Sequence, residues 1–411
     1  MALFDGSNAP TITVEFDLTK QGAFVLGIST LGGSDVLGTG ATVWSAVPVA
    51  NIRSVSIRRG RSREDQAVQP GTLSLVLENF SGNYDPDNTA STYYWNGYSL
   101  LSRGLGVRVS ATWSGTTYVI YRGYLEQLDI DASLDPIASF QFTDALAYLA
   151  TQTVTAIASS YSGDTTSTRL GRILDAIGWD SGLRNISGSR QMQPTTFGDT
   201  ALSLGDQVSR CEFGRFYVDR QGNVVLLPYE STFTTPSRIA FSDTRASGTI
   251  EYDTIVTAPG IKYLINSVTL NQATGTAQTF TDTNSSLRYG TYPKTYDAPL
   301  LTNSVALDLA TTITYRYSQP KTRVDRVEFD ALGIDSSSWT SLLQTDLGDN
   351  VTVARTTVDA RSRTYTDLVE SISHDLTPDG WRVGMDLSPA GATGYFILGS
   401  SLIGGTDGLY S

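Results

Sequence analysis

The residues that could carry chemistry are few and far apart in this sequence. There is one histidine, His374, and one cysteine, Cys211. A cysteine and a histidine can act together as a nucleophile and its base, but no local motif supports that pairing here. A solvated histidine at the start of the turn that runs to Asp379 is the ordinary interpretation. The sequence also lacks the Gly-x-Ser-x-Gly, His-Glu-x-x-His and Walker motifs.

One loop offers oxygen atoms at alternate positions, which would suit calcium. Its candidate ligands are Asn83, Asp85, Asp87 and Asn88. The loop lacks the sixth-position glycine and twelfth-position glutamate of an EF-hand, and Pro86 lies inside it. Capping of local turns by these short polar side chains is the favoured explanation.

A second acidic group, Glu126, Asp129 and Asp131, could form the carboxylate pair of a polysaccharide hydrolase. Acidic residues are abundant throughout the chain, so such a pair is weak evidence. Nothing in the sequence requires catalysis. We therefore expect no enzyme activity and no catalytic, cofactor-binding or metal-binding residue.

The composition is that of a folded protein rich in strands. The chain has 411 residues, of which 40% are hydrophobic and 17% charged, and this length suits roughly two to four domains. Its 38 glycines and 21 tyrosines, together with only three methionines and only short helical patterns, indicate β structure. The formal net charge of −12 disfavours nucleic-acid binding through basic patches, but it is compatible with a conduit through which DNA slides without binding.

Simple signals also bear on where the protein resides. With a single cysteine the chain cannot form an internal disulfide, so nothing requires an oxidising compartment. Residues 1–10 lack the basic and apolar regions of a signal peptide, and no stretch approaches ~20 consecutive apolar residues. We expect a soluble protein without a membrane span, made in a host cytoplasm.

The fold is organised around residues 51–150, where apolar and polar residues alternate with the period of a strand. The segments that show this alternation are 54–58, 73–77, 107–113, 118–120 and 140–142. Thr143 is a candidate N-cap for a short amphipathic helix that carries Leu146 and Leu149. This region predicts a small antiparallel barrel or sandwich with a helix laid on it.

Residues 151–250 indicate an α+β insertion domain. Apolar residues stand at helical spacing from 170 to 177, with Ser167 or Thr168 as candidate N-caps, and a second helix is expected after Thr200. A hairpin should turn at 219–223.

Residues 251–389 repeat the first pattern, with several strands and one helix. The expected elements are a strand at 263–270, a helix from about Ser304, and strands at 324–329, 350–355, 365–373 and 381–387. The chain is therefore predicted to be mainly β, with two barrel-like domains, each covered by a helix, flanking the insertion.

The two ends of the chain resemble each other. Residues 24–37 (FVLGISTLGGSDVL) and 396–409 (FILGSSLIGGTDGL) are identical at eight of fourteen positions. Both predict two short strands around a Gly-Gly turn. Shared composition is one explanation; the other is a pair of docking arms, 1–50 and 390–411, with Phe24, Leu26, Phe396 and Leu398 as contact residues.

Two clusters are candidates for an assembly interface. The first is basic and consists of Arg58, Arg59, Arg61 and Arg63. It is either a solvated hairpin tip that protects a sheet edge or a contact with an acidic neighbour. The second is aromatic and includes Tyr93, Tyr94, Trp95 and Tyr98, which are expected to be exposed beside a flexible loop. We favour a subunit interface for it over carbohydrate binding.

A family resemblance adds what spacing cannot supply. A series of short segments, each typical of a turn and a strand, occurs in an order that resembles the minor tail proteins of long-tailed phages of actinobacteria and related hosts. The resemblance is to the tail-tip or baseplate-hub group of these proteins. The segments include VSIRRGRSRE (55–64), NYDPDNTASTYY (83–94), FTDALAYLA (142–150), LGRILDAIGW (170–179), FYVDRQGNVVLLP (216–228), LGDNVTV (347–353) and HDLTPDGWRVGMDLSPA (374–390). Each segment alone is weak, but together they cover nearly the whole chain.

The resemblance implies a homotrimeric hub that closes the distal end of the tail tube in the virion. Each subunit would supply two tail-tube-like antiparallel β-barrel domains, so three subunits would form a pseudo-sixfold ring around a DNA channel. The Arg58–Arg63 segment would contact another subunit or ring, and the insertion 151–250 would widen or plug the hub. Expected partners are a tail-tube or distal tail protein, a tape-measure protein, and tail fibres or other tip proteins.

One departure from the family qualifies this picture. Many relatives continue into carbohydrate-binding, fibre or lytic regions, whereas this sequence ends soon after the second Gly-Gly segment. An adaptor that anchors fibres is therefore expected rather than a receptor-binding protein. The alternative of a different class is a β-rich carbohydrate-binding adhesin.

Overall fold

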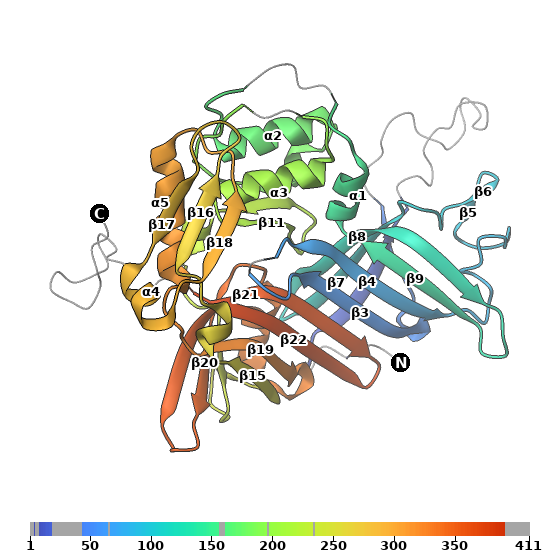
Figure 1. The fold of residues 1–411 in the computed structure, drawn as a ribbon. Helices are drawn as coiled ribbons and strands as arrows, with labels where there is room; N and C mark the ends of the chain where they lie inside the picture. Colours follow the sequence, from blue (N-terminus) through green and yellow to red (C-terminus); the bar gives the residue numbers. More distant parts are fainter. Residues whose placement is uncertain are drawn as a thin grey trace.

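The computed structural model describes Phe4 and residues 8–18, 43–64, 66–155, 161–194, 197–232 and 235–390. Both Gly-Gly segments, with Phe24, Leu26, Phe396 and Leu398, lie outside these ranges. The described part is mainly β, as the sequence predicts, and is built on one large sheet with helices above it (Figure 1).

In the first strand set, the segments with alternating apolar and polar residues form strands, as predicted. Its strands are β1 (Thr11–Asp17), β2 (Trp44–Ala46), β3 (Ile52–Gly60), β4 (Gln69–Glu78), β7 (Gly106–Trp113), β8 (Thr116–Asp131) and β9 (Ile137–Thr143), with a small hairpin of β5 (Tyr94–Trp95) and β6 (Tyr98–Ser99). On β4, Leu73, Leu75 and Leu77 are fully buried. The order β3-β4-β9-β8-β7-β1-β2 is antiparallel throughout.

The second strand set lies at the other end of the same sheet. It contains β13 (Ile239–Ser242), β14 (Ile250–Glu251), β15 (Thr254–Ala258), β19 (Arg323–Asp330), β20 (Asn350–Thr356), β21 (Ser362–Thr377) and β22 (Gly380–Pro389). A short helix, α6 (Trp339–Gln344), precedes β20. Its Trp339 ring packs against Trp113 of the first set and Trp381 of the second, so aromatic contacts span both sets.

The prediction of two closed barrels is wrong for the described strands, which form one open sheet of 14 strands. The cause is β21, which pairs with β20 through its first half and then with β3 through its second half. Since β4 occupies the other edge of β3, no edge of β3 is left to close the first set on itself. The two sets are consequently continuous with each other.

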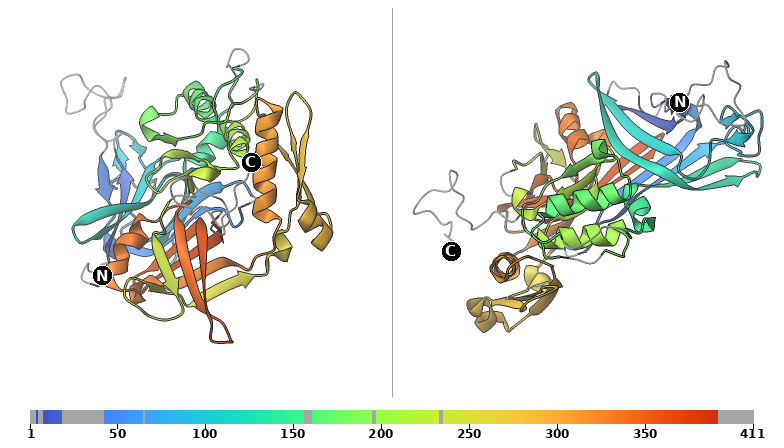
Figure 2. Two further views of the ribbon diagram at one scale, coloured as in Figure 1. Left: turned by 90° about the vertical axis from the view of Figure 1, so that its left-hand side faces the viewer. Right: turned by 90° about the horizontal axis from the view of Figure 1, so that it is seen from above.

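The middle of the chain forms a helical layer above the first set (Figures 1 and 2). It contains α1 (Ala145–Thr151), α2 (Thr166–Ala176), α3 (Ala201–Cys211) and a small sheet of β10 (Arg184–Ile186), β11 (Arg215–Val218) and β12 (Val224–Leu227). The helix expected after Thr200 is confirmed as α3, and Thr200 caps it. The predicted caps of the other two helices are wrong, because Asp144 caps α1 and Thr165 caps α2 through side-chain oxygens that accept from backbone N–H groups.

A second small sheet holds the helix that was expected to cover the second barrel. The sheet contains β16 (Ser267–Asn271), β17 (Gln278–Thr281) and β18 (Pro293–Asp297), accompanied by α4 (Thr283–Tyr289) and α5 (Asn303–Tyr317). Helix α5 packs on β16 and β17 instead of on the large sheet. That expectation is therefore corrected: the strand from 267 to 271 belongs to this separate layer.

Strands β3 and β21 approach each other closely at Gly60, which has φ +102°. A Cβ at this position would lie 2.2 Å from the Glu370 carbonyl oxygen. Replacing Gly60 with alanine should therefore destabilise the protein by roughly 2–5 kcal/mol, through backbone strain and overlap. Gly97→Ala is the control, because Gly97 also has positive φ but no neighbour within 4 Å. Urea midpoints that shift equally in the two variants would contradict a tight β3–β21 contact.

Candidate functional site

Buried charges gather where the two strand sets, the middle layer and α5 meet. We call this group the ion-pair junction. Its members are Arg59, Arg61, Glu64, Arg215, Arg220, Arg316, Arg323, Asp346, Asp367 and Glu370. They come from segments more than two hundred residues apart, such as Arg61 and Glu370, separated by 309 positions.

Glu370, on β21, is the centre of one half of the junction. Its Oε2 accepts a hydrogen bond from Arg61 Nε at 2.7 Å, and Arg215 pairs with its Oε1. The Ser388 hydroxyl also donates to Oε1, at 2.5 Å. Burial alone would raise the pKa of Glu370, but Arg215 and Arg61 hold it well below its usual value. The carboxylate is therefore ionised and fully paired.

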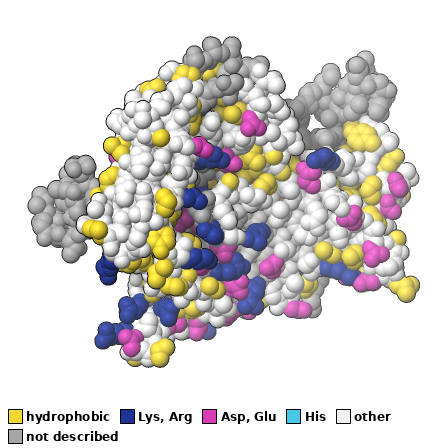
Figure 3. All heavy atoms as spheres, viewed as in Figure 1, with side chains coloured by type: hydrophobic (Ala, Val, Ile, Leu, Met, Phe, Trp, Pro, Cys, Tyr) yellow, Lys and Arg dark blue, Asp and Glu magenta, His cyan; other side chains and the backbone are white. Residues whose placement is uncertain are grey.

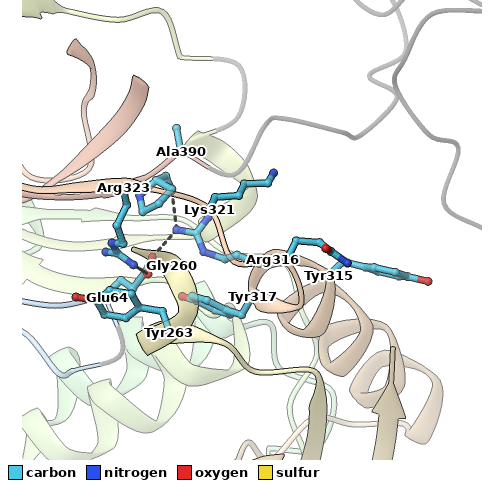
Figure 4. A pocket seen from close by; sticks show the side chains of 11 residues that line it. Glu64, Gly260, Tyr263, Tyr315, Arg316, Tyr317, Lys321, Arg323 and Ala390 are labelled. Carbon is cyan, nitrogen blue, oxygen red and sulfur yellow. Dashed lines mark hydrogen bonds and ion pairs between the residues drawn. The ribbon is translucent and has the colours of Figure 1, made fainter. Parts of the chain in front are cut away.

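Glu64 is the centre of the other half. Its two oxygens pair with Arg316 at 2.5 Å and with Arg323 at 2.8 Å (Figure 4). Burial opposes ionisation, yet these two arginines keep the pKa of Glu64 below its ordinary value. The Arg323 guanidinium also lies 4.0 Å from the centroid of the Tyr263 ring. A cavity of about 80 Å³ is lined by this group.

A third ion pair joins β3 to the segment after α6. Arg59 Nη1 lies 2.7 Å from Asp346 Oδ1, and the backbone N–H of Arg220 donates to Asp346 Oδ2 at 3.0 Å. Arg220 also donates to the Leu343 carbonyl oxygen at 2.6 Å. The hairpin at 219–223, which the sequence predicted, is thereby fixed to the second strand set.

Asp367 differs from the other carboxylates of the junction. It is almost fully buried on β21, and its Oδ2 has no hydrogen-bond partner within the described ranges. Burial raises its pKa to about 8, although Arg323 acts in the opposite direction. Its carboxyl group is therefore protonated at neutral pH, while the paired carboxylates are charged. This arrangement is suited to holding segments together, because the ionised groups are paired within the chain.

The four arginines of the basic cluster do not all lie at a solvated hairpin tip, which was one interpretation of the cluster. Arg59 and Arg61 are buried in the junction, so that interpretation is wrong for these two residues. Arg58 is exposed and donates to the Ser62 hydroxyl, and Arg63 lies 5.6 Å from the Tyr263 ring centroid. A contact of the cluster with a neighbouring subunit stays a prediction.

The aromatic cluster is also divided. Tyr93 is buried and stacks on Tyr84, so its expected exposure is wrong. Tyr94 and Trp95, on β5, are partly buried. Their role at a subunit interface remains a prediction.

His374 is a core residue rather than a solvated turn residue. It lies within β21, and its Nδ1 accepts a hydrogen bond from Trp381 Nε1 at 3.3 Å. The turn is displaced because β21 continues to Thr377. Cys211 is buried at the end of α3, where its thiol donates to the Gln207 carbonyl oxygen. Burial raises the pKa of this thiol to about 12, so it is not an activated nucleophile.

His374 should make the protein sensitive to acid. Burial, together with the charge of Arg59, lowers its pKa to about 3. The unfolded chain therefore binds a proton below about pH 6.5 that the folded chain does not, and stability falls as pH decreases. Between pH 6.5 and 5 the loss should be about 2 kcal/mol. His374→Gln should lose less stability over this interval in urea titrations; an unchanged pH dependence would contradict the assignment.

The loop considered for calcium is a set of capped turns. Asp85 Oδ1 accepts from the Asp87 N–H at 2.9 Å, and Asn88 Oδ1 accepts from the Ala90 N–H at 3.0 Å. Asn83 Oδ1 accepts from the Thr92 N–H at 3.0 Å. These contacts confirm the turn-capping explanation. Within the described ranges, no group of three or more His, Cys, Asp or Glu residues could hold a metal ion.

The three acidic residues of β8 do not act as a unit. Glu126 pairs with Arg103 at 2.6 Å, whereas Asp129 and Asp131 are exposed further along the strand.

Among the helices that the structure describes, none is long and apolar enough to cross a membrane.

Few features of the sequence indicate the ion-pair junction. Charged residues inside strands were its only local signal: Glu370 stands in the apolar run of β21, and Arg215 directly precedes the apolar residues of β11. Isolated charges in buried strands imply partners but do not identify them.

Comparison with known proteins places the fold. No protein-family model matches the chain, and no curated protein matches its sequence. The solved tail protein from Neisseria meningitidis MC58 is 11% identical, with a TM-score of 0.58 over 93% of this chain and 98% of that one. The 43 kDa tail protein of prophage MuSo2 from Shewanella oneidensis is 12% identical, with a TM-score of 0.56 over 93% and 99%. Along nearly its whole length, the chain has the fold of these two tail proteins.

Proposed function

We propose that this protein is a structural component of a phage tail, without enzyme activity, and that it acts as a homotrimeric hub at the distal end of the tail tube. The observation that carries the proposal is the shared fold with two tail proteins over 93% of the chain. The arrangement of the sheet supplies the further support.

Each chain would contribute two units to a pseudo-sixfold ring. The proposed division is an arm (1–50), a first tube-like unit (51–150), an insertion (151–250), a second tube-like unit (251–389) and a second arm (390–411). The two strand sets that carry these units are joined by β3 and β21, so each chain would enter the ring as one body. The outer strands β2, β14 and β15 end the sheet, and neighbouring subunits could cover such edges.

The ion-pair junction suits a component that must keep its shape under load. Breaking a buried pair leaves an uncompensated charge, so the junction resists separation of the strand sets. The hub would contact a tail-tube or distal tail protein, a tape-measure protein, and fibres or other tip proteins. DNA would pass through it without sequence-specific contacts, in keeping with a net charge of −12.

The test is native mass spectrometry of the full chain, alone and with its tail-tube partner. A trimer, or a trimer bound to a hexameric tube ring, is expected. A protein that stays monomeric under both conditions would contradict the hub.

Carbohydrate binding is the second candidate function. Its supporting observation is a pocket of about 570 Å³ whose lining includes Tyr124, Tyr148 and Trp179. Tyr148 and Trp179 are in ring contact at 5.8 Å, and aromatic faces with nearby polar groups are common in ligand sites. A glycan array without signal above background would remove this candidate.

A further inference from the structure

A groove rich in positive charge lies beside the β20–β21 hairpin of this acidic protein. It is lined by Lys321, Thr322, Arg355, Thr357, Arg363, Thr364 and Tyr365, with a volume of about 730 Å³. Among the residues that the structure describes, the lining contains three basic side chains and no carboxylate. Figure 3 shows Lys and Arg side chains gathered at the lower left of the molecule, over this hairpin. We call it the basic groove.

Two arginines of the basic groove are placed at the expense of stability. Arg355 and Arg363 are direct partners across the antiparallel pair of β20 and β21, so their side chains emerge on the same face. Like charges in this position are destabilising. Arg355 donates to the Thr257 hydroxyl at 3.0 Å, and Asp359 at the hairpin tip pairs with Arg361. The Thr357 hydroxyl and, to a smaller extent, the charge of Arg363 hold the pKa of Asp359 below its usual value, so Arg363 has one exposed carboxylate in its neighbourhood. An anion between the two arginines would offset their repulsion.

Two exposed acidic residues lie at the end of β8. Asp129 and Asp131 are exposed and two residues apart, so they share one face of the strand. They accept hydrogen bonds from Gln127 Nε2 and from the Ser133 N–H, and neither makes an ion pair in the part of the chain that the structure describes. Leu134, in the turn that follows, is fully exposed. We call Asp129 and Asp131 the acidic tip.

The acidic tip and the basic groove lie at opposite ends of the molecule, as the β8–β9 and β20–β21 hairpins show (Figures 1 and 2). One protomer therefore cannot bring them together. We propose that the basic groove receives the acidic tip of a second copy of this chain. Such a contact joins two different surfaces head to tail, and repeated contacts of this kind close into a ring when the rotation permits. The inference rests on the proposed homotrimer and assigns its contact surfaces.

A nucleic acid is the less suitable occupant. Its phosphates would meet only three cations in a chain whose net charge is −12, whereas specific phosphate tracking uses longer basic surfaces. The acidic tip instead offers two carboxylates for the two arginines, and charge complementarity of this kind selects partner and register.

The experiment compares full-length variants by native mass spectrometry and sedimentation. Arg355→Glu/Arg363→Glu should weaken self-association at least about tenfold, and Asp129→Lys/Asp131→Lys should do the same. A chain that carries all four changes should associate again, because both surfaces are reversed together. Arg245→Glu/Arg288→Glu is the matched control: both residues are exposed and the charge changes equally. Raising NaCl from about 0.05 M to about 0.5 M should weaken wild-type association.

A second readout separates this contact from a folding defect. Arg363→Gln should raise the melting temperature of the dissociated protein, since it removes the like-charge pair, while it weakens association. Trimers that persist unchanged in all charge variants would overturn the contact and leave the hub standing. A wild-type monomer would overturn both. If the groove variants lost single-stranded DNA binding while their self-association stayed unchanged, the proposed contact with the acidic tip would be overturned in favour of a nucleic acid.

Discussion

Glu370→Gln should lower the free energy of unfolding by about 3–5 kcal/mol. The substitution leaves Arg61 and Arg215 buried without their carboxylate, and solvent cannot reach them to compensate. Because β21 joins the two strand sets at this point, we expect their contact to loosen first. Urea unfolding followed by tryptophan fluorescence would measure the loss, and hydrogen exchange at β3 and β21 would locate it.

The control for this experiment is Glu328→Gln on β19. Glu328 also pairs with an arginine, Arg326, at 2.7 Å, but both side chains are about one-third exposed. An exposed pair contributes about 0–1 kcal/mol, so this variant should unfold almost as the wild type does. Equal losses in the two variants would show that burial does not decide the strength of the Glu370 pairs.

Asp367→Asn should stabilise the protein at alkaline pH. With a folded pKa of about 8, the native state retains a proton that the unfolded chain releases near pH 4. The contribution of Asp367 to stability is therefore fully present below about pH 4 and is lost as pH rises toward 8, by up to about 5 kcal/mol. Asparagine keeps the size of the side chain without the charge, so the variant should lack this decline.

The measurement is the difference between wild-type and Asp367→Asn unfolding free energies at several pH values. Other buried acids, such as Asp144 with a pKa of about 7, titrate equally in both proteins and cancel in the difference. The difference should grow between pH 5 and 8 in favour of the variant. A constant difference would mean that Asp367 is already ionised in the folded protein.

Local elements were the part of the fold that could be predicted. The leucines of β4 alternate as required and are fully buried, and α3 begins after Thr200 where a helix was expected. Such patterns depend only on neighbours within a few residues, for which strand and helix periods are fixed. The hairpin after β11 followed from its turn residues for the same reason.

The relation between distant segments could not be predicted in this way. The division into two closed barrels failed because β21 is long enough to pair with both β20 and β3 along its length. Likewise, His374 was placed in a turn because the strand was expected to end before it, whereas pairing with β22 extends the strand to Thr377. The residue at which a strand ends depends on the strands that pair with it, and these strands can be distant in the sequence.

By itself, the sequence determined a mainly β chain, several of its helix and strand segments, an acidic net charge and a resemblance to phage tail proteins. Only the tertiary structure decided that the strand sets are continuous, that Arg59 and Arg61 are buried, and that Glu64 and Glu370 each bind two arginines. The physical reason is the range of the interactions. Backbone periodicity is encoded within a few residues, whereas a buried charge is satisfied by whichever opposite charge the fold brings within about 3 Å.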